Sequence, residues 1–64
     1  MVFDNIKSLC EKKGMSIYEL ERSAGVGNGI IGKWRDPDRA PNISSLNAIA
    51  KVLEVDIAEL LREE

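Results

Sequence analysis

Residues 16–25 carry two signals that fix where a short helix begins and where it ends. Ser16 and Glu19 have the Ser-x-x-Glu spacing of a capping box, in which the serine oxygen accepts a hydrogen bond from a first-turn amide and the carboxylate accepts one from the cap amide. Gly25 readily takes the left-handed backbone conformation that ends a helix. The sequence therefore predicts a helix over Ile17–Ala24, followed directly by a sharp turn.

A second short helix is expected after this turn, over residues 28–35. Ile31 and Trp34 are three residues apart and therefore share its inward face, while Val26 is expected to fill the corner between the two helices. Two short helices joined by a glycine turn are typical of a helix-turn-helix unit, whose second helix lies in the major groove of DNA. Any two helices can be joined by a glycine, so the flanking segments decide how specific this pattern is.

The segment before the capping box is expected to form a longer helix over Val2–Lys13, ending at Gly14. Its inward face is expected to hold Val2, Phe3, Ile6, Leu9 and Cys10. Cys10 is the single cysteine and the chain has no histidine, so neither an internal disulfide nor a zinc site of the usual Cys/His type is available. Cys10 is therefore expected to be a small buried apolar side chain rather than a reactive thiol.

Two more helices are expected after a loop at residues 36–41, because the two prolines of that segment block a helix. Asn42 is expected to cap a helix over Ile43–Leu53, and Asp56 with Glu59 predicts a second capping box that opens a last short helix. The inward residues of these two helices are expected to be Ile43, Leu46, Ile49, Ala50, Leu53, Ile57, Leu60 and Leu61.

Together these segments predict one all-α domain of five helices over residues 1–64, without repeats or linkers, in a chain that ends where the fold ends. They resemble the helix-turn-helix domain of phage and bacterial repressors of the Cro and lambda-repressor type, often called the XRE group. The residues that carry the resemblance, within residues 3–61, are Leu20, Gly25, Val26, Ile31 and Trp34, followed by Leu46, Ile49, Ala50, Leu53, Val55, Ile57, Leu60 and Leu61.

The resemblance implies a compact five-helix, lambda-repressor-like domain with the helix-turn-helix at its second and third helices. It implies a sequence-specific regulator of transcription, a repressor, that binds a two-fold operator in double-stranded DNA as a homodimer. Two positions depart from the family pattern: Ile17 replaces a glutamine that clamps a phosphate, and Glu21 replaces a small residue packed on the third helix. Glu21 is therefore expected to tilt outward and to pair with Arg22 or Lys33.

The residues expected to contact bases are Asn28, Gly29, Ile30, Gly32 and Lys33. Asn28 offers a donor and an acceptor that suit the edge of adenine, although asparagine at a helix start is also a common cap. Lys33 suits guanine or a phosphate, and Ile30 suits either a thymine methyl group or the flank of the core. The glycines favour close approach of the backbone to DNA, or a helix that becomes ordered on binding.

The residues expected to contact phosphates are Ser16, Ile17, Tyr18, Gly27, Arg35, Arg39, Ser44 and Ser45. The first three surround the exposed amides at the start of the helix Ile17–Ala24, and a helix N-terminus attracts anions. Arg35 and Arg39 lie with Lys33 at the end of the second motif helix and in the loop after it, where phosphates run in this docking geometry. Ser44 and Ser45 either donate to phosphates or serve only as local caps.

The net charge of −2 argues against nucleic-acid binding, but the distribution of charge changes that view. Residues 1–51 hold eight lysines and arginines against six acidic residues, whereas residues 52–64 hold one against five. No histidine, metal-binding cluster, phosphate loop or nucleophile–base pair is present, so no enzyme activity, metal or cofactor is expected. Apolar runs never exceed three residues, which excludes a membrane-spanning helix or a signal peptide and predicts a cytoplasmic protein.

The alternative on the same fold is a protein-interaction module of the antitoxin or anti-repressor type, in which the surface that would face the groove binds protein instead. The acidic tail and the near-neutral charge fit that reading. If the domain does bind DNA, Glu19 or Glu21 on the outer side of their helix are candidates to contact RNA polymerase, although acidic pairs on helices are commonly only solvated.

Overall fold

Five α-helices follow one another in the computed structural model, which describes residues 2–36 and 38–62 and contains no strand in these residues. Their bounds are α1 (Val2–Lys13), α2 (Ile17–Ala24), α3 (Ile30–Lys33), α4 (Ile43–Leu53) and α5 (Ile57–Leu60). The all-α class and the order of the helices are confirmed. Pro37, within the expected loop, lies outside the described residues.

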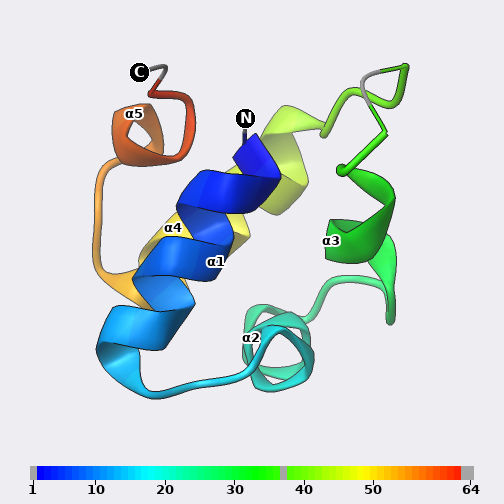
Figure 1. Cartoon of the computed structure of the whole chain (residues 1–64). Helices are drawn as coiled ribbons and strands as arrows, with labels where there is room; N and C mark the ends of the chain where they lie inside the picture. The colour runs from blue at the N-terminus through cyan, green and yellow to red at the C-terminus, as the bar shows by residue number, and fades with distance from the viewer. Residues whose placement is uncertain (1, 37, 63–64) are drawn as a thin grey trace.

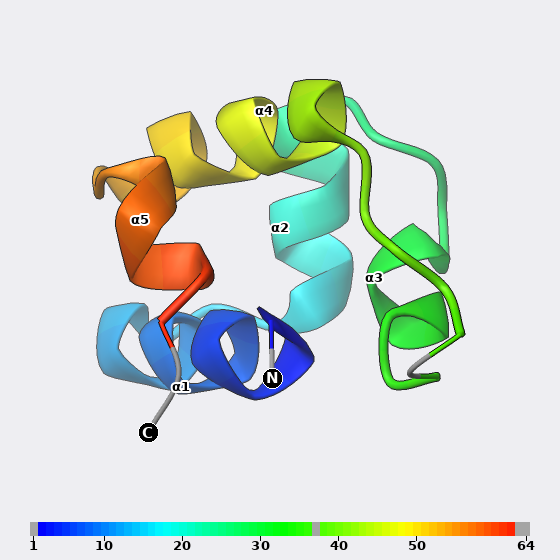
Figure 2. The same ribbon diagram turned by 90° about the horizontal axis from the view of Figure 1, so that it is seen from above.

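Four helices, α1, α2, α4 and α5, surround the core, and α3 lies at its edge. In Figure 2, α1 and α4 lie on opposite sides, α2 and α5 run between them, and α3 lies beyond α2. The contacts agree with this view, because α2 packs on α4, α1 contacts α2, α4 and α5, and α3 packs on α2. Figure 1 shows the same separation of α3 from α5, which are at opposite sides of the molecule.

The core draws on all five helices. Its buried residues are Ile6, Cys10, Leu20, Ile31, Trp34, Leu46, Ile49, Ala50, Leu53 and Leu60. Cys10 is 2% exposed, and its pKa is raised mainly by burial and secondarily by the charge of Glu11. A raised pKa keeps the thiol protonated, so Cys10 is the small buried apolar side chain that the sequence predicts.

The caps of α2 and α4 form as predicted. The Ser16 hydroxyl accepts a hydrogen bond from the Glu19 amide, and the Glu19 carboxylate accepts one from the Ser16 amide, both at 3.0 Å. At the start of α4, the Asn42 side-chain oxygen accepts from the Ser45 amide at 2.7 Å. These contacts involve residues three apart, and local spacing is sufficient to predict them.

The capping box predicted for α5 is wrong, because Asp56 makes no side-chain cap bond. The Glu59 amide donates instead to the main-chain oxygen of Asp56, at 2.9 Å, and so already has a partner. The Glu59 carboxylate pairs with Arg62 at 3.3 Å rather than reaching back to the helix start.

Two residues predicted to face the core are exposed. Ile43 is 61% exposed and Leu61 is 46% exposed. Ile43 is the first residue of α4 and Leu61 follows the last residue of α5, so both extend past the packed part of their helices. The prediction that these two residues face the core is therefore wrong at the start of α4 and at the end of α5.

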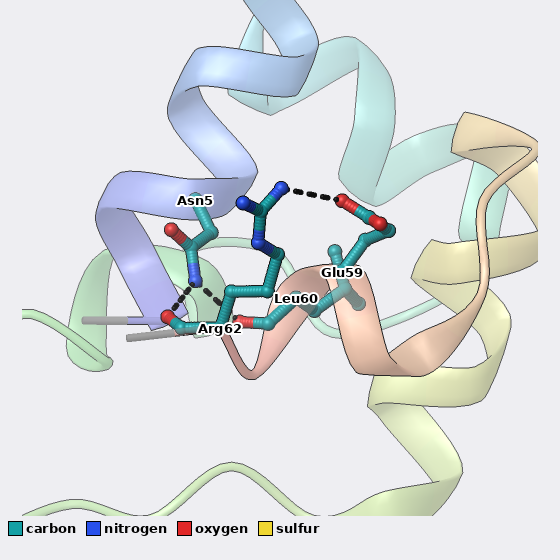
Figure 3. Close-up of polar contacts among 4 residues, drawn as sticks. All are labelled: Asn5, Glu59, Leu60 and Arg62. Carbon is teal, nitrogen blue, oxygen red and sulfur yellow. Dashed lines mark hydrogen bonds and ion pairs between the residues drawn. The ribbon is translucent and has the colours of Figure 1, made fainter. Parts of the chain in front are cut away.

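Asn5 joins α1 to the residues at the end of α5 (Figure 3). Its side-chain nitrogen donates to the main-chain oxygens of Leu60, at 2.9 Å, and Arg62, at 2.7 Å. Carbonyl groups at the end of a helix lack donors within the helix, and the Asn5 side-chain amide supplies such a donor at the end of α5. Sequence reasoning missed Asn5, although it lies three residues after Val2 and four before Leu9, on the apolar stripe of α1.

Replacing Asn5 with alanine is expected to lower the free energy of unfolding by about 1–3 kcal/mol, because two hydrogen bonds are lost. Asn5→Asp has the same shape but cannot donate, so it should lose at least as much. Urea denaturation followed by circular dichroism measures both, with Asn47→Ala on the exposed side of α4 as the control. Wild-type stability of Asn5→Asp would contradict the donor role of Asn5.

Candidate nucleic-acid interface

The turn after α2 has the geometry that its glycine predicts. Gly25 has φ 71°, in the left-handed region, and its amide donates to the Arg22 oxygen at 3.3 Å. The amide of half-buried Val26 donates to the Glu21 oxygen at 3.2 Å. These two bonds are those of a Schellman motif, which ends α2 and turns the chain toward α3.

The helix after the turn is shorter than predicted, since α3 spans Ile30–Lys33 rather than residues 28–35. Gly29 precedes it with φ 84°, a left-handed conformation that a right-handed helix cannot include. Asn28 therefore lies in the turn before the helix. At the other end, the amide of Trp34 donates to the Ile31 oxygen at 3.0 Å, in a tighter turn that follows α3.

Glu21 is buried beneath this helix start, and the predicted outward tilt with an Arg22 or Lys33 partner is wrong. The residue is 3% exposed. Its two carboxylate oxygens accept hydrogen bonds from the amides of Gly29, at 2.9 Å, and Ile31, at 3.0 Å. The first amides of a helix lack partners within the helix, and a buried carboxylate requires donors, so each group satisfies the other.

The candidate base-contacting residues divide into exposed and half-buried ones. Asn28, Gly29 and Lys33 are exposed, while Ile30 and Gly32 are half-buried. Ile30 packs against the core cluster, as its core-flank reading predicts. The cap position of α3 is Gly29, and Glu21 supplies the acceptor there, so Asn28 is not the cap of this helix.

The candidate phosphate-contacting residues lie in four separate segments of the chain. Ser16, Ile17 and Tyr18 are at the start of α2, and Gly27 is in the turn after it. Arg35 and Arg39 follow α3, and Ser44 and Ser45 are in the first turn of α4. A helix of eight residues is about 12 Å long, and α3 lies alongside it. The fold therefore places α3 beside α2, while the start of α4 lies apart from α2 in Figure 1.

Some of these candidates are already engaged within the protein. The Ser16 hydroxyl accepts from Glu19, and Ile17 is half-buried against the core. Tyr18 is 54% exposed, and Gly27, Arg35, Arg39 and Ser44 are exposed, whereas Ser45 is half-buried.

Two arginines lie over aromatic rings. The Arg35 guanidinium is 5.0 Å from the centre of the Phe3 ring, and that of Arg22 is 5.7 Å from the Tyr18 ring. Such cation–π contacts hold a charged group in place without neutralising it. Arg22 was missed as a candidate, although its position four residues after Tyr18 on one helix signals the contact.

No group of three or more His, Cys, Asp or Glu side chains in the described part of the chain is arranged to hold a metal ion. Within residues 2–36 and 38–62, none of the helices has the length and apolar character needed to cross a membrane.

Comparison with known proteins gives one assignment. No curated protein and no solved structure matches the chain significantly. The sequence does match the family of the Cro/C1-type helix-turn-helix DNA-binding domain, and the match covers residues 5–63. That range contains α2, its left-handed glycine turn and α3, together with α4 and α5. The chain therefore belongs to the Cro/C1-type helix-turn-helix DNA-binding domain family.

Proposed function

We propose that the chain is a transcriptional repressor that binds a two-fold operator as a homodimer, with α3 in the major groove. The arrangement around α3 carries this proposal. Ile31 and Trp34 are buried behind the helix, while Asn28 before it and Lys33 at its end are exposed. An amide and an ammonium group at these places suit the edges of adenine and guanine, or a phosphate in the case of Lys33.

The distribution of charge in space supports binding to DNA. The cations Lys33, Arg35 and Arg39 are exposed at the end of α3 and in the segment after it. The acidic residues Glu54, Asp56 and Glu59 lie just before or within α5, which is across the molecule from α3 in both Figure 1 and Figure 2. Asp36 and Asp38 are exposed in the same segment as the three cations, so residues 33–39 carry three cations against two carboxylates. The local charge near α3 is therefore positive, although the net charge of the chain is −2.

Pairing on DNA follows from the size of the reading element. One module of this size buries too little DNA surface for strong specificity, and two-fold operators match two-fold protein pairs. Glu19 is the remaining candidate for contact with RNA polymerase, because Glu21 is buried. A cytoplasmic location, where operator DNA is accessible, is part of this proposal.

The proposal is tested by separating base reading from phosphate anchoring. Selection from random duplexes first identifies the preferred site. Asn28→Ala should then weaken that site by about 1–3 kcal/mol and relax the preference at one base pair per half-site, with little change for random DNA. Lys33→Ala, if Lys33 holds a phosphate, should weaken all sequences alike.

Titrations on the selected and the random duplex distinguish these two patterns. Both variants must first show wild-type helical content by circular dichroism. If both remain folded and every binding isotherm is unchanged, α3 does not read DNA. Binding to a protein partner through the same surface, as in an antitoxin or anti-repressor, would then replace the repressor proposal.

A further inference from the structure

We propose that Glu21 is a positioning residue that determines sequence specificity, by holding the backbone around α3 in its reading conformation before DNA is bound. This inference rests on the proposed function. It starts from the two hydrogen bonds that the buried Glu21 carboxylate accepts, from Gly29 at 2.9 Å and from Ile31 at 3.0 Å. Glu21 belongs to α2, so the bonds join the two helices of the motif.

The segment that these bonds hold has little local means of staying ordered. Asn28 lies between Gly27 and Gly29, and glycine loses more backbone freedom on folding than any other residue. Gly29 also has φ 84°. The helix that follows has only four residues, far fewer than a helix needs to be stable by itself. Order in this segment must therefore come from contacts with the rest of the domain.

Glu21 supplies such a contact on both sides of the start of α3. One bond holds the residue directly after Asn28, and the other holds the second residue of α3. Hydrogen bonds to a charged acceptor are stronger than neutral ones, and here the acceptor is 3% exposed. Both partners of the Glu21 carboxylate are main-chain amides, and no described lysine or arginine forms an ion pair with it.

The consequence for binding is selective. A reading segment that is already ordered avoids an ordering cost when it meets its operator. Binding to random DNA depends chiefly on charge and counterion release, and requires no fixed placement of Asn28. Loss of the Glu21 bonds should therefore reduce the affinity for the selected site while leaving the affinity for random duplex nearly unchanged.

The variants are Glu21→Gln and Glu21→Ala, compared with Glu19→Gln. Glu21→Gln keeps the size of the side chain but has only one acceptor oxygen, so one of the two amides loses its partner. This milder variant still tests the proposal if Glu21→Ala does not fold. Glu19→Gln removes the same charge from the same helix, and a glutamine also serves in a capping box.

Amide hydrogen exchange of the free protein, measured by NMR, gives the first readout. The amides of Gly29 and Ile31 should both exchange faster in Glu21→Ala, and one of them should do so in Glu21→Gln. The core amide of Ile49 on α4 should keep its wild-type rate, which shows that the change is local.

The ratio of affinities for the selected and the random duplex gives the second readout. This ratio should fall about tenfold in Glu21→Ala, because ordering the backbone of one additional residue on binding costs about that factor in affinity. It should fall less in Glu21→Gln. It should stay unchanged in Glu19→Gln.

Unchanged exchange at Gly29 and Ile31 in the Glu21 variants would overturn the positioning role. Faster exchange with an unchanged affinity ratio would overturn the link to specificity. A wild-type protein that shows no sequence preference would overturn the proposed function and the specificity role with it, and the exchange rates would still report separately whether Glu21 holds the segment.

Discussion

Trp34→Ala is expected to lower the free energy of unfolding by about 3–5 kcal/mol, the range for removing a large aromatic side chain from a core. Trp34 is 6% exposed and belongs to the core cluster, directly after α3. Small domains have a total stability near the lower end of about 5–15 kcal/mol. The variant should therefore keep only about 0–2 kcal/mol of stability and be partly unfolded at room temperature.

This effect is measured by thermal and urea denaturation, with the helical circular dichroism signal at about 222 nm as the readout. Tyr18→Ala is the matched control, because Tyr18 is an aromatic residue of the same motif that is 54% exposed. Its loss should lower stability by about 1 kcal/mol or less, including the contact with Arg22. An unchanged melting temperature of Trp34→Ala would refute the buried role of Trp34.

Affinity for the operator is expected to fall about 10³-fold as the salt concentration rises from about 50 to about 200 mM. Lys33, Arg35 and Arg39 are exposed near α3, and the same three cations in each of two subunits neutralise about six phosphates. Each neutralised phosphate releases a bound counterion, and added salt opposes that release. Fluorescence anisotropy titrations on labelled duplex, repeated over a salt series, give the slope.

Variants of these cations test the assignment. Arg39→Ala should flatten the slope by about two units for the dimer, one for each subunit. Lys12→Ala is the control, because Lys12 belongs to the C-terminal end of α1, which lies away from α3 in Figures 1 and 2. A slope that does not differ between Arg39→Ala and wild type would remove Arg39 from the interface. Binding that is weak at every salt concentration would favour the protein-interaction alternative.

Local signals predicted most of the helix bounds. The ends of α1, α2 and α4 agree with the sequence because each is marked by a nearby residue, such as Gly14, Gly25 or Asn42. The inward stripe of α4 is likewise correct apart from Ile43. These features depend on contacts between residues three or four apart, which spacing alone describes.

The errors occur where a distant group decides the local structure. Spacing predicted a longer third helix, but Gly29 adopts a left-handed conformation and the helix start is capped by Glu21 from another helix. The same contact reverses the expected tilt of Glu21, and the family pattern of a small residue there offered no guide. Asn5 was missed for a related reason, since its partners lie 55 and 57 residues away. The assignments of Asn28 and Lys33 to base edges remain predictions.

The four-residue length of α3 limits how much sequence one bound copy reads directly. A helix of that length extends about 6 Å along its axis, and stacked base pairs are about 3.4 Å apart. The helix of one copy therefore spans about two base-pair steps, which are too few to specify a single site in a genome. Most of the specificity must therefore come from the spacing and relative orientation of the two half-sites, and from how readily the DNA between them bends.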